Sequence, residues 1–237
     1  MSSIRVVLLA GVGLVGGSAA ADGGCPDGMA SVGGRFCIDR WEASLVLVDD
    51  QGHELGPHSP FEVATGDVEV AARTRPGVHP QAHVSARVAA RACERAGKRL
   101  CSKDEWLAAC RGRQPTRYPY GVKHRPGYCN DDGVSPIGIL RGARAGGLDY
   151  AALNDKRLNQ VPGSLARTGT FNRCQNEYGV SDMVGNLHEW TAEGGGVFRG
   201  GFYLDTRSLG EGCDYNTHGH DLDYRDYSTG FRCCADP

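Results

Sequence analysis

The chain has 237 residues and carries 26 Lys and Arg against 28 Asp and Glu, a formal net charge of −2. This length is enough for one domain with a substantial hydrophobic core, and the balanced charge offers no basic field to recruit nucleic acid or an anionic membrane. Ten cysteines argue against a cytosolic housekeeping enzyme, and 35 glycines predict many turns and irregular loops.

The first residues have the pattern of a secretory signal. Arg5 is followed by an apolar run over 6–15 and then by small residues, which predicts a signal peptide of 1–21 and a single domain of 22–237. The run is shorter than the roughly 20 residues that span a bilayer, so an uncleaved anchor is the less favoured alternative. No other segment is apolar enough to cross, and we therefore expect a secreted or periplasmic protein without a membrane span.

Short strands are expected on both sides of a helical middle. Alternating residues predict a hairpin across 29–38 that continues into 43–48, and a strand-like stretch over 63–70. Residues 113–173 are mostly turns, and such a long irregular region needs disulfides or bound ions to be ordered. Residues 178–234 alternate in short strand-like pieces. The mixture predicts an α+β domain with two helices, a small twisted sheet and much ordered loop.

The two helices have clear ends. Ser85 can cap a helix that continues to Ala96 and stops at Gly97. Residues 102–105 form a capping box for a second helix, which continues to 111 and stops at a glycine. The side chains expected on the buried side of this second helix are Trp106, Leu107 and Cys110.

All ten cysteines lie in the predicted mature part, and an even number in an exported chain predicts five disulfides. A metal site is the alternative, but no CxxC pair occurs and the spacings resemble no zinc site. Adjacent Cys233 and Cys234 should bond to different partners, because a disulfide needs a wider Cα separation than neighbours have. Cys25 and Cys37 flank the first hairpin turn and could close it.

Several segments, taken together and in order, resemble the formylglycine-generating enzyme, or sulfatase-modifying factor, family. They are 83–85 (HVS), 96–100 (AGKRL), 104–106 (DEW), 109–112 (ACRG), 118–121 (YPYG), 178–190 (YGVSDMVGNLHEW), 198–201 (FRGG) and 230–233 (GFRC). The resemblance covers about 29–234 and implies a variant of the C-type-lectin-like fold with little regular secondary structure. Members include copper-dependent oxidases, relatives of non-heme iron enzymes and lectin-like binding modules, so the fold alone does not decide the function.

The position of the copper site separates these classes. In the family's oxidases a serine follows the Arg-Gly-Gly motif, and two cysteines shortly after it hold copper(I), which requires soft thiolates. Here Phe202 takes the serine position and Asp205 the position of the first copper cysteine, and 202–212 contains no cysteine. The sequence therefore predicts that the copper oxidase mechanism is absent.

The resemblance also implies disulfide pairs. It pairs Cys93 with Cys233 and Cys110 with Cys213, so that Cys213 is a structural cysteine and not a metal ligand. Cys25–Cys37 is then the third expected pair, whereas the pairing of Cys101, Cys129, Cys174 and Cys234 stays open, with Cys129–Cys174 and Cys101–Cys234 as the favoured arrangement.

Calcium is the cofactor that the resemblance implies. Residues 182–189 match the family's calcium loop, in which Asp182 and Glu189 would supply carboxylate oxygens and Gly185 and Leu187 backbone carbonyls, the hard donors that calcium takes. The alternative is a turn in which Asp182 caps backbone amides and Glu189 pairs with an arginine.

Three weaker candidates remain. A second family calcium site would begin at Asn130. His218, His220 and Asp221 could bind iron or zinc, although a solvated polar loop is the favoured alternative. A further set of aromatic and charged side chains could line a recognition surface, or its tyrosines could complete the core; the set comprises Tyr203, Asp205, Arg207 and Tyr215.

The sequence thus favours an exported, disulfide-stapled and calcium-stabilised monomer that binds a small ligand or a protein partner. One alternative is a metal-dependent oxidoreductase with a non-heme iron centre at His218, His220 and a carboxylate. The other is a formylglycine-generating oxidase with a divergent site.

Overall fold

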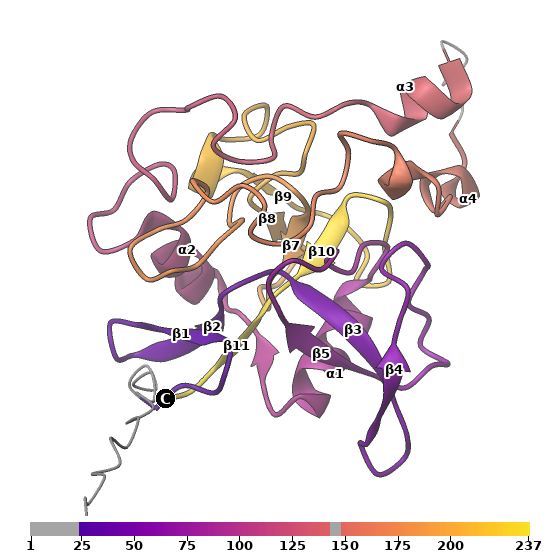
Figure 1. Ribbon diagram of the computed structural model, residues 1–237, viewed down its shortest axis with the longest axis horizontal. Coiled ribbons are helices and arrows are strands. Elements are labelled where there is room, and N and C mark those ends of the chain that lie inside the picture. The colour runs from indigo at the N-terminus through magenta and orange to yellow at the C-terminus, as the bar shows by residue number, and fades with distance from the viewer. Residues whose placement is uncertain (1–23, 143–147) are drawn as a thin grey trace, which may run out of the picture.

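The computed structural model describes residues 24–142 and 148–237, so the predicted signal peptide lies outside the described residues. Short elements are joined by long loops, which confirms the α+β prediction (Figure 1). The strands are β1 (Met29–Val32), β2 (Phe36–Asp39), β3 (Ala43–Val48), β4 (Glu54–Pro57), β5 (Val70–Thr74), β6 (Arg99–Leu100), β7 (His188–Trp190), β8 (Phe198–Arg199), β9 (Asn216–Thr217), β10 (Thr229–Phe231) and β11 (Cys233–Ala235). The α-helices are α1 (Ala86–Arg95), α2 (Lys103–Arg111), α3 (Pro136–Arg141) and α4 (Tyr150–Leu153), and single 3₁₀ turns lie at Leu158–Gln160 and Gly212–Asp214.

Three small sheets form the framework, with the strand orders β1-β2-β11-β6, β10-β7-β8-β9 and β4-β3-β5. In the first sheet the C-terminal strand β11 lies between β2 and β6 and is antiparallel to both. In the second, β10 runs parallel to β7. Figure 1 shows β11 leading from the middle of the molecule to the β1–β2 hairpin. The two ends of the described chain therefore meet in one sheet.

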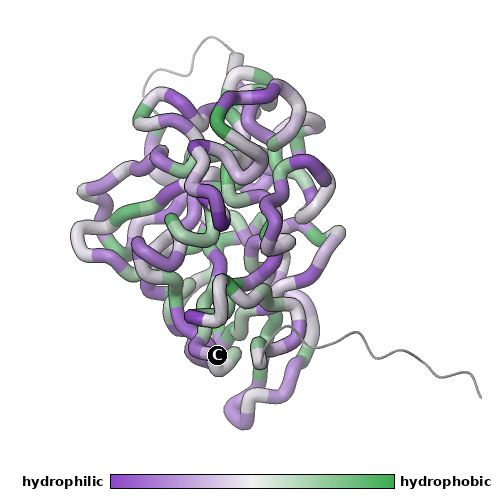
Figure 2. Tube along the Cα trace, turned by 90° about the vertical axis from the view of Figure 1, so that its left-hand side faces the viewer, coloured by the Kyte–Doolittle hydropathy of each residue, from purple (hydrophilic) through white to green (hydrophobic). Residues whose placement is uncertain are grey.

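Two main clusters of buried side chains form the core. One lies against α2 and includes Trp106 and Met183. The other lies against α1 and includes Trp190 and Phe231. Figure 2 shows short hydrophobic and hydrophilic stretches alternating along the trace, as expected for many short elements. Among the described residues, no helix is long and apolar enough to cross a membrane.

The two longer helices begin and end where the sequence predicts. The Ser85 side chain caps α1, and Gly97 follows that helix with a φ of 69°. Ser102 and Glu105 form the predicted capping box of α2, which ends at Gly112. These caps satisfy backbone N–H groups that have no partner within the helix.

Some local expectations are wrong. The strand expected over 63–70 begins only at Val70, because the polar residues before it form a turn. Leu107 is half-buried, whereas Trp106 and Cys110 are fully buried as expected. The short helices α3 and α4 lie in the stretch that was expected to be mostly turns.

The disulfides hold distant parts of the chain together. The three predicted pairs are present, the other four cysteines pair in the favoured arrangement, and none of the described cysteines is free. The pairs are Cys25–Cys37, Cys93–Cys233, Cys101–Cys234, Cys110–Cys213 and Cys129–Cys174. Since the chain has ten cysteines, these bonds account for every one of them.

Candidate functional site

The loop over 182–189 is a tight turn between the core clusters. Asp182 and Asn186 have φ values of 60° and 58°, which is uncommon for residues other than glycine. At Gly185 a Cβ atom would lie 2.2 Å from the carbonyl oxygen of Asn130, so only glycine fits there. The structure therefore brings Asn130 against the predicted calcium loop.

Glu189 is the middle residue of β7 and forms a bidentate ion pair with Arg232. Both of its oxygens lie 2.7 Å from guanidinium nitrogens, and one oxygen also accepts from the indole N–H of Trp106 at 2.7 Å. Glu189 and Arg232 are 1% and 0% exposed. This is the arginine pairing that the sequence left as an alternative, and it leaves Glu189 with spare capacity at one oxygen, because a carboxylate accepts about four hydrogen bonds.

Asp182 lies opposite this ion pair in the same buried region. Its Oδ2 accepts a hydrogen bond from the backbone N–H of Gly169 at 2.7 Å. Burial raises the pKa of Asp182 to about 6, although the Gly169 N–H and Arg232 both oppose this rise. The ionised form of Asp182 is therefore less stable here than in water, and a further positive charge nearby would favour it.

Glu42, in the turn between β2 and β3, is a third buried carboxylate, and the sequence analysis did not identify it. Its oxygens accept hydrogen bonds from the Leu187 backbone N–H at 3.1 Å and from the Asn186 side chain at 2.5 Å. Burial, followed by the charges of Asp182 and Glu189, holds the pKa of Glu42 well above its usual range. No local sequence signal links Glu42 to a loop about 145 residues away.

These three carboxylates share the charge of Arg232, which acts on all of them. Carboxylates that are desolvated together need positive charge or protons, and this set has the one guanidinium of Arg232. In residues 24–142 and 148–237, no group of three His, Cys, Asp or Glu side chains is arranged to hold a metal ion. Calcium here would accordingly depend on backbone oxygens such as those of Gly185 and Leu187, together with Asp182 and Glu189.

Aromatic side chains surround Phe202 and Asp205, the positions that correspond to the copper site of the family's oxidases. The ring of His188 lies 4.8 Å from the ring of Phe202 and 5.5 Å from that of Tyr215, centroid to centroid. Burial lowers the pKa of His188 to about 3, so its ring is neutral, and its Nδ1 has no hydrogen-bond partner among the described groups. Asp205 Oδ2 accepts from the Tyr215 hydroxyl at 3.1 Å. This region thus presents rings and one carboxylate in place of thiolates.

The four residues of the predicted recognition surface are placed differently. Arg207 is exposed, Asp205 is half-buried, and Tyr215 is buried beside Asp205. Tyr203 is fully buried, and its hydroxyl lies 3.1 Å from Oδ1 of Asn159. Tyr203 therefore packs the core, whereas Arg207 lies at the surface.

A polar cluster that the sequence analysis missed lies beside Arg207. Oδ2 of the buried Asp131 lies 2.7 Å from His124 Nε2 and accepts from the Thr206 hydroxyl at 3.1 Å. The other ring nitrogen of His124 lies 3.3 Å from an Arg207 nitrogen. Asp131 thus orients His124 toward Arg207.

The structure does not bring together His218, His220 and Asp221, the predicted histidine metal site. His218 and Asp221 are exposed. His220 is half-buried, with its ring stacked 4.4 Å from that of Phe198 and its Nε2 2.6 Å from the Thr217 hydroxyl. His220 therefore packs against the protein, while its two proposed partners face solvent.

Comparisons with known proteins assign the chain to a family. Residues 6–237 match the family described as the sulfatase-modifying factor enzyme 1-like domain. The chain belongs to this family. A relative from Bos taurus, named inactive C-alpha-formylglycine-generating enzyme 2, is 31% identical over 151 residues, which cover 59% of this chain and 44% of the relative. This sulfatase-modifying factor domain therefore spans less than half of that protein.

Solved structures agree on the fold. CarF is similar with a TM-score of 0.50 and 17% identity, covering 85% of this chain and 86% of CarF. The I1 variant of the major tropism determinant also has a TM-score of 0.50, with 15% identity, covering 90% of this chain and 53% of that protein. At these identities the likeness concerns the fold alone. The sulfatase-modifying factor domain thus has the expected variant of the C-type-lectin-like fold.

Proposed function

We propose that this protein is an exported sulfatase-modifying factor domain that binds a ligand or protein partner and does not oxidise cysteine with copper. The observation that carries the proposal is that every cysteine of the chain is bonded to another cysteine. Copper(I) in the family's oxidases needs a pair of thiolates, and a disulfide offers none. The bovine relative, which is named inactive, supports the same reading.

Export is supported by the disulfides. Five such bonds persist in oxidising compartments, whereas the cytosol keeps thiols reduced. The signal pattern over 1–21 agrees with this placement.

Calcium is the proposed structural cofactor. It would neutralise the carboxylates of Glu42, Asp182 and Glu189, which share the single guanidinium of Arg232. Its role would be to hold the loop over 182–189 in its strained conformation, and no reaction step is assigned to it.

A copper titration tests the proposal directly. The purified protein should not compete with a chromogenic chelator for copper(I), and with copper present it should consume no oxygen when a cysteine-containing peptide is added. Tight copper(I) binding with oxygen-dependent oxidation of the peptide would overturn the proposal.

A metal census of the exported protein separates the remaining alternatives. Elemental analysis should find calcium and no stoichiometric transition metal. One iron per chain would favour the non-heme iron oxidoreductase, and replacing His220 by Gln would then have to remove that iron.

A further inference from the structure

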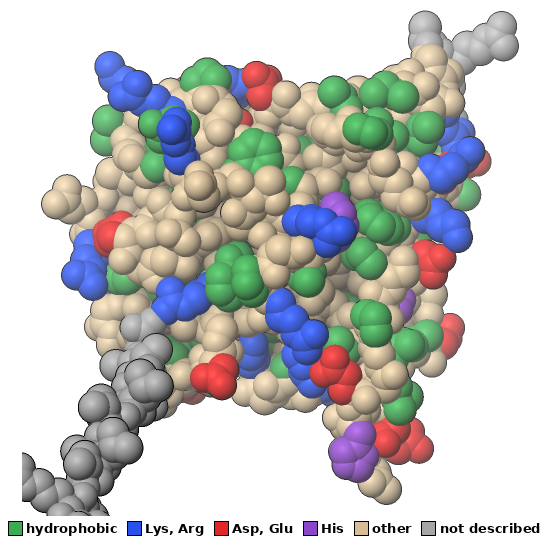
Figure 3. All heavy atoms as spheres, viewed as in Figure 1, with side chains coloured by type: hydrophobic (Ala, Val, Ile, Leu, Met, Phe, Trp, Pro, Cys, Tyr) green, Lys and Arg blue, Asp and Glu red, His purple; other side chains and the backbone are tan. Residues whose placement is uncertain are grey.

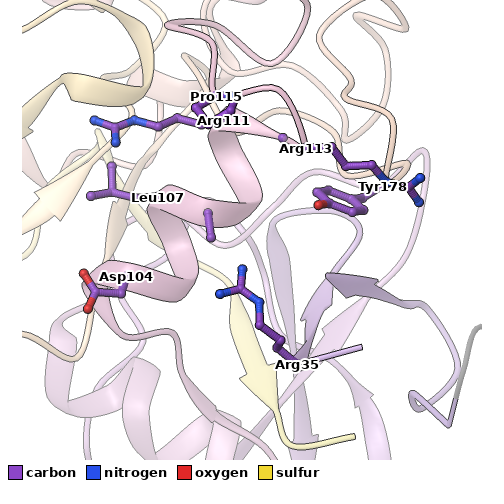
Figure 4. A pocket seen from close by; sticks show the side chains of 9 residues that line it. Arg35, Asp104, Leu107, Arg111, Arg113, Pro115 and Tyr178 are labelled. Atoms are coloured by element: carbon purple, nitrogen blue, oxygen red, sulfur yellow. The ribbon is translucent and has the colours of Figure 1, made fainter. Parts of the chain in front are cut away.

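A hollow of about 400 Å³ lies beside α2, and none of its lining residues belongs to the calcium loop. Its walls come from the β1–β2 turn, the length of α2 and the loop that contains Tyr178. Figure 4 shows Arg35 reaching from the hairpin into the space between α2 and Tyr178. We call this hollow the arginine groove and define it by Arg35, Leu107, Ala108, Arg111, Arg113 and Tyr178.

The arginines of the groove differ in their partners. Arg111 pairs with Asp214. Among the described residues, neither Arg35 nor Arg113 has a carboxylate side chain within ion-pair distance. The guanidinium of Arg113 instead lies 5.3 Å from the centre of the Tyr178 ring, and that of Arg35 lies 5.9 Å from the centre of the Phe36 ring. Such stacking holds the guanidinium plane and leaves its N–H edge free for an anion.

The floor of the groove is apolar. Leu107 and Ala108 are half-buried on the open side of α2, whereas the sequence places Leu107 on the buried side of this helix. Asp104 is the acidic residue that lines the groove, and it lies in the first turn of α2, whereas Arg113 lies beyond the last turn. The C-terminal end of the groove therefore carries the guanidinium of Arg113 over an apolar floor, and the Glu177 carboxylate accepts from the Arg113 backbone N–H.

The groove continues along the surface. A neighbouring hollow of about 540 Å³ shares Arg111 and Pro115 and adds Arg117, Lys123 and Asp214, and Arg117 pairs with Glu211. A third hollow, of about 690 Å³, shares Arg113 and adds Glu177. A long open depression of this kind fits an extended chain better than a compact small molecule, which buries most of its surface in an enclosed pocket.

Charge complementarity selects the occupant. The whole chain has a formal net charge of −2, and Lys, Arg, Asp and Glu side chains are interspersed on the face in Figure 3. The unpaired Arg35 and Arg113 therefore form a local positive site on a slightly acidic protein, which would steer an anionic segment to this place.

We infer that the arginine groove binds an extended acidic peptide segment of a protein partner. Carboxylates of the segment contact Arg35 and Arg113, and an aliphatic side chain packs on Leu107 and Ala108. This inference deepens the proposed binding role by naming a partner class, and it concerns a surface separate from the calcium loop.

A labelled peptide of alternating Glu and Leu, with a Gln and Leu peptide for comparison, tests the inference by fluorescence anisotropy on the whole mature protein. The Glu peptide should bind more tightly than the Gln peptide, and its binding should weaken with added salt. The double variant Arg35→Gln with Arg113→Gln should weaken binding about tenfold.

The matched control is Arg87→Gln with Arg157→Gln, which changes the net charge equally at exposed side chains elsewhere. It should leave the affinity almost unchanged, and both double variants should keep the wild-type melting temperature.

Equal weakening by the two double variants, or equal binding of the Glu and Gln peptides, would overturn the inference. Preference of the groove for a sulfated oligosaccharide over the Glu peptide would overturn the peptide assignment. Copper oxidase activity would instead refute the proposed function, whether or not the Glu peptide binds.

Discussion

Arg232, next to the last disulfides of the chain, forms a buried bidentate ion pair with Glu189 at the end of the predicted calcium loop. The guanidinium also donates to the backbone carbonyls of Asp39 and Ser181, at 3.0 and 2.9 Å. One side chain therefore connects the first sheet, the calcium loop and the β7–β10 pair. Such a junction explains how a domain with little regular structure keeps one arrangement of its loops.

Replacing Arg232 by Met should lower the free energy of unfolding by about 3–5 kcal/mol, because Glu189 would remain buried without its partner. Urea denaturation followed by near-UV circular dichroism measures the change. The exposed pair of Arg157 and Asp155 is the comparison, and Arg157→Met should cost less than about 1 kcal/mol. Equal costs for the two variants would show that the buried pair does not hold the junction.

The local elements of this fold are predictable from sequence, and the distant relationships largely are not. Ser85 and Ser102 specify helix starts, because a cap depends on residues only three positions away. The contact of Glu42 with Leu187 has no such local signal, and neither does the contact of Asp131 with Thr206. Of the disulfide pairs, the resemblance implies two and the hairpin turn suggests Cys25–Cys37, whereas no local signal decides how the other four cysteines pair.

The site is partly predictable for the same reason. A motif places Asp182 and Glu189 in one loop. It does not reveal that Arg232 forms an ion pair with Glu189, or that Glu42 adds a third carboxylate. Burial also changes what a side chain can do. Tyr203, a candidate for a recognition surface, is 0% exposed, because it packs in the core beside Leu187.

Asp182→Asn should separate calcium binding from folding. Asn tolerates the positive φ and keeps an oxygen for the Gly169 N–H. In excess chelator the variant should melt no lower than the wild-type protein, because it removes a buried charge. Calcium should raise the melting temperature of the wild-type protein and should have little effect on the variant.

The control for this experiment is Asp149→Asn, since Asp149 caps α4 through the Ala152 N–H and lies outside the calcium loop. It should keep the full calcium-induced shift. If calcium raises the melting temperature of Asp182→Asn as much as that of the wild-type protein, Asp182 is not a ligand. If calcium does not stabilise the wild-type protein, the calcium proposal itself is wrong.

His83 should make stability depend on pH. Burial lowers the pKa of His83 below its ordinary 6.5, although Asn154 and nearby carboxylates oppose the shift. The unfolded chain therefore binds a proton more readily than the folded protein does. Stability that is present above pH 6.5 should be lost as the pH falls below that value.

His83→Asn should reduce this loss, because Asn tolerates the backbone φ of 53° at this position and does not titrate. The free energy of unfolding is measured between about pH 7 and pH 5 at saturating calcium, which keeps the carboxylates of the calcium loop ionised. An identical slope in His83→Asn would mean that other groups cause the acid sensitivity.

The disulfides should contribute unequally. Cys93–Cys233 closes a loop with a sequence separation of 140, and Cys25–Cys37 one of 12. The loss of chain entropy in the unfolded state grows with the logarithm of loop length, so removing the longer link as a Cys→Ala pair should cost about 2 kcal/mol more. Urea denaturation of the two double variants measures this difference, and a thiol count confirms that the other four disulfides are intact.

Because Cys93 and Cys233 are both fully buried in the core cluster of α1, the cavity left by their sulfurs acts in the same direction. An equal or smaller cost for the longer link would mean that the unfolded chain retains enough structure to cancel the entropy difference.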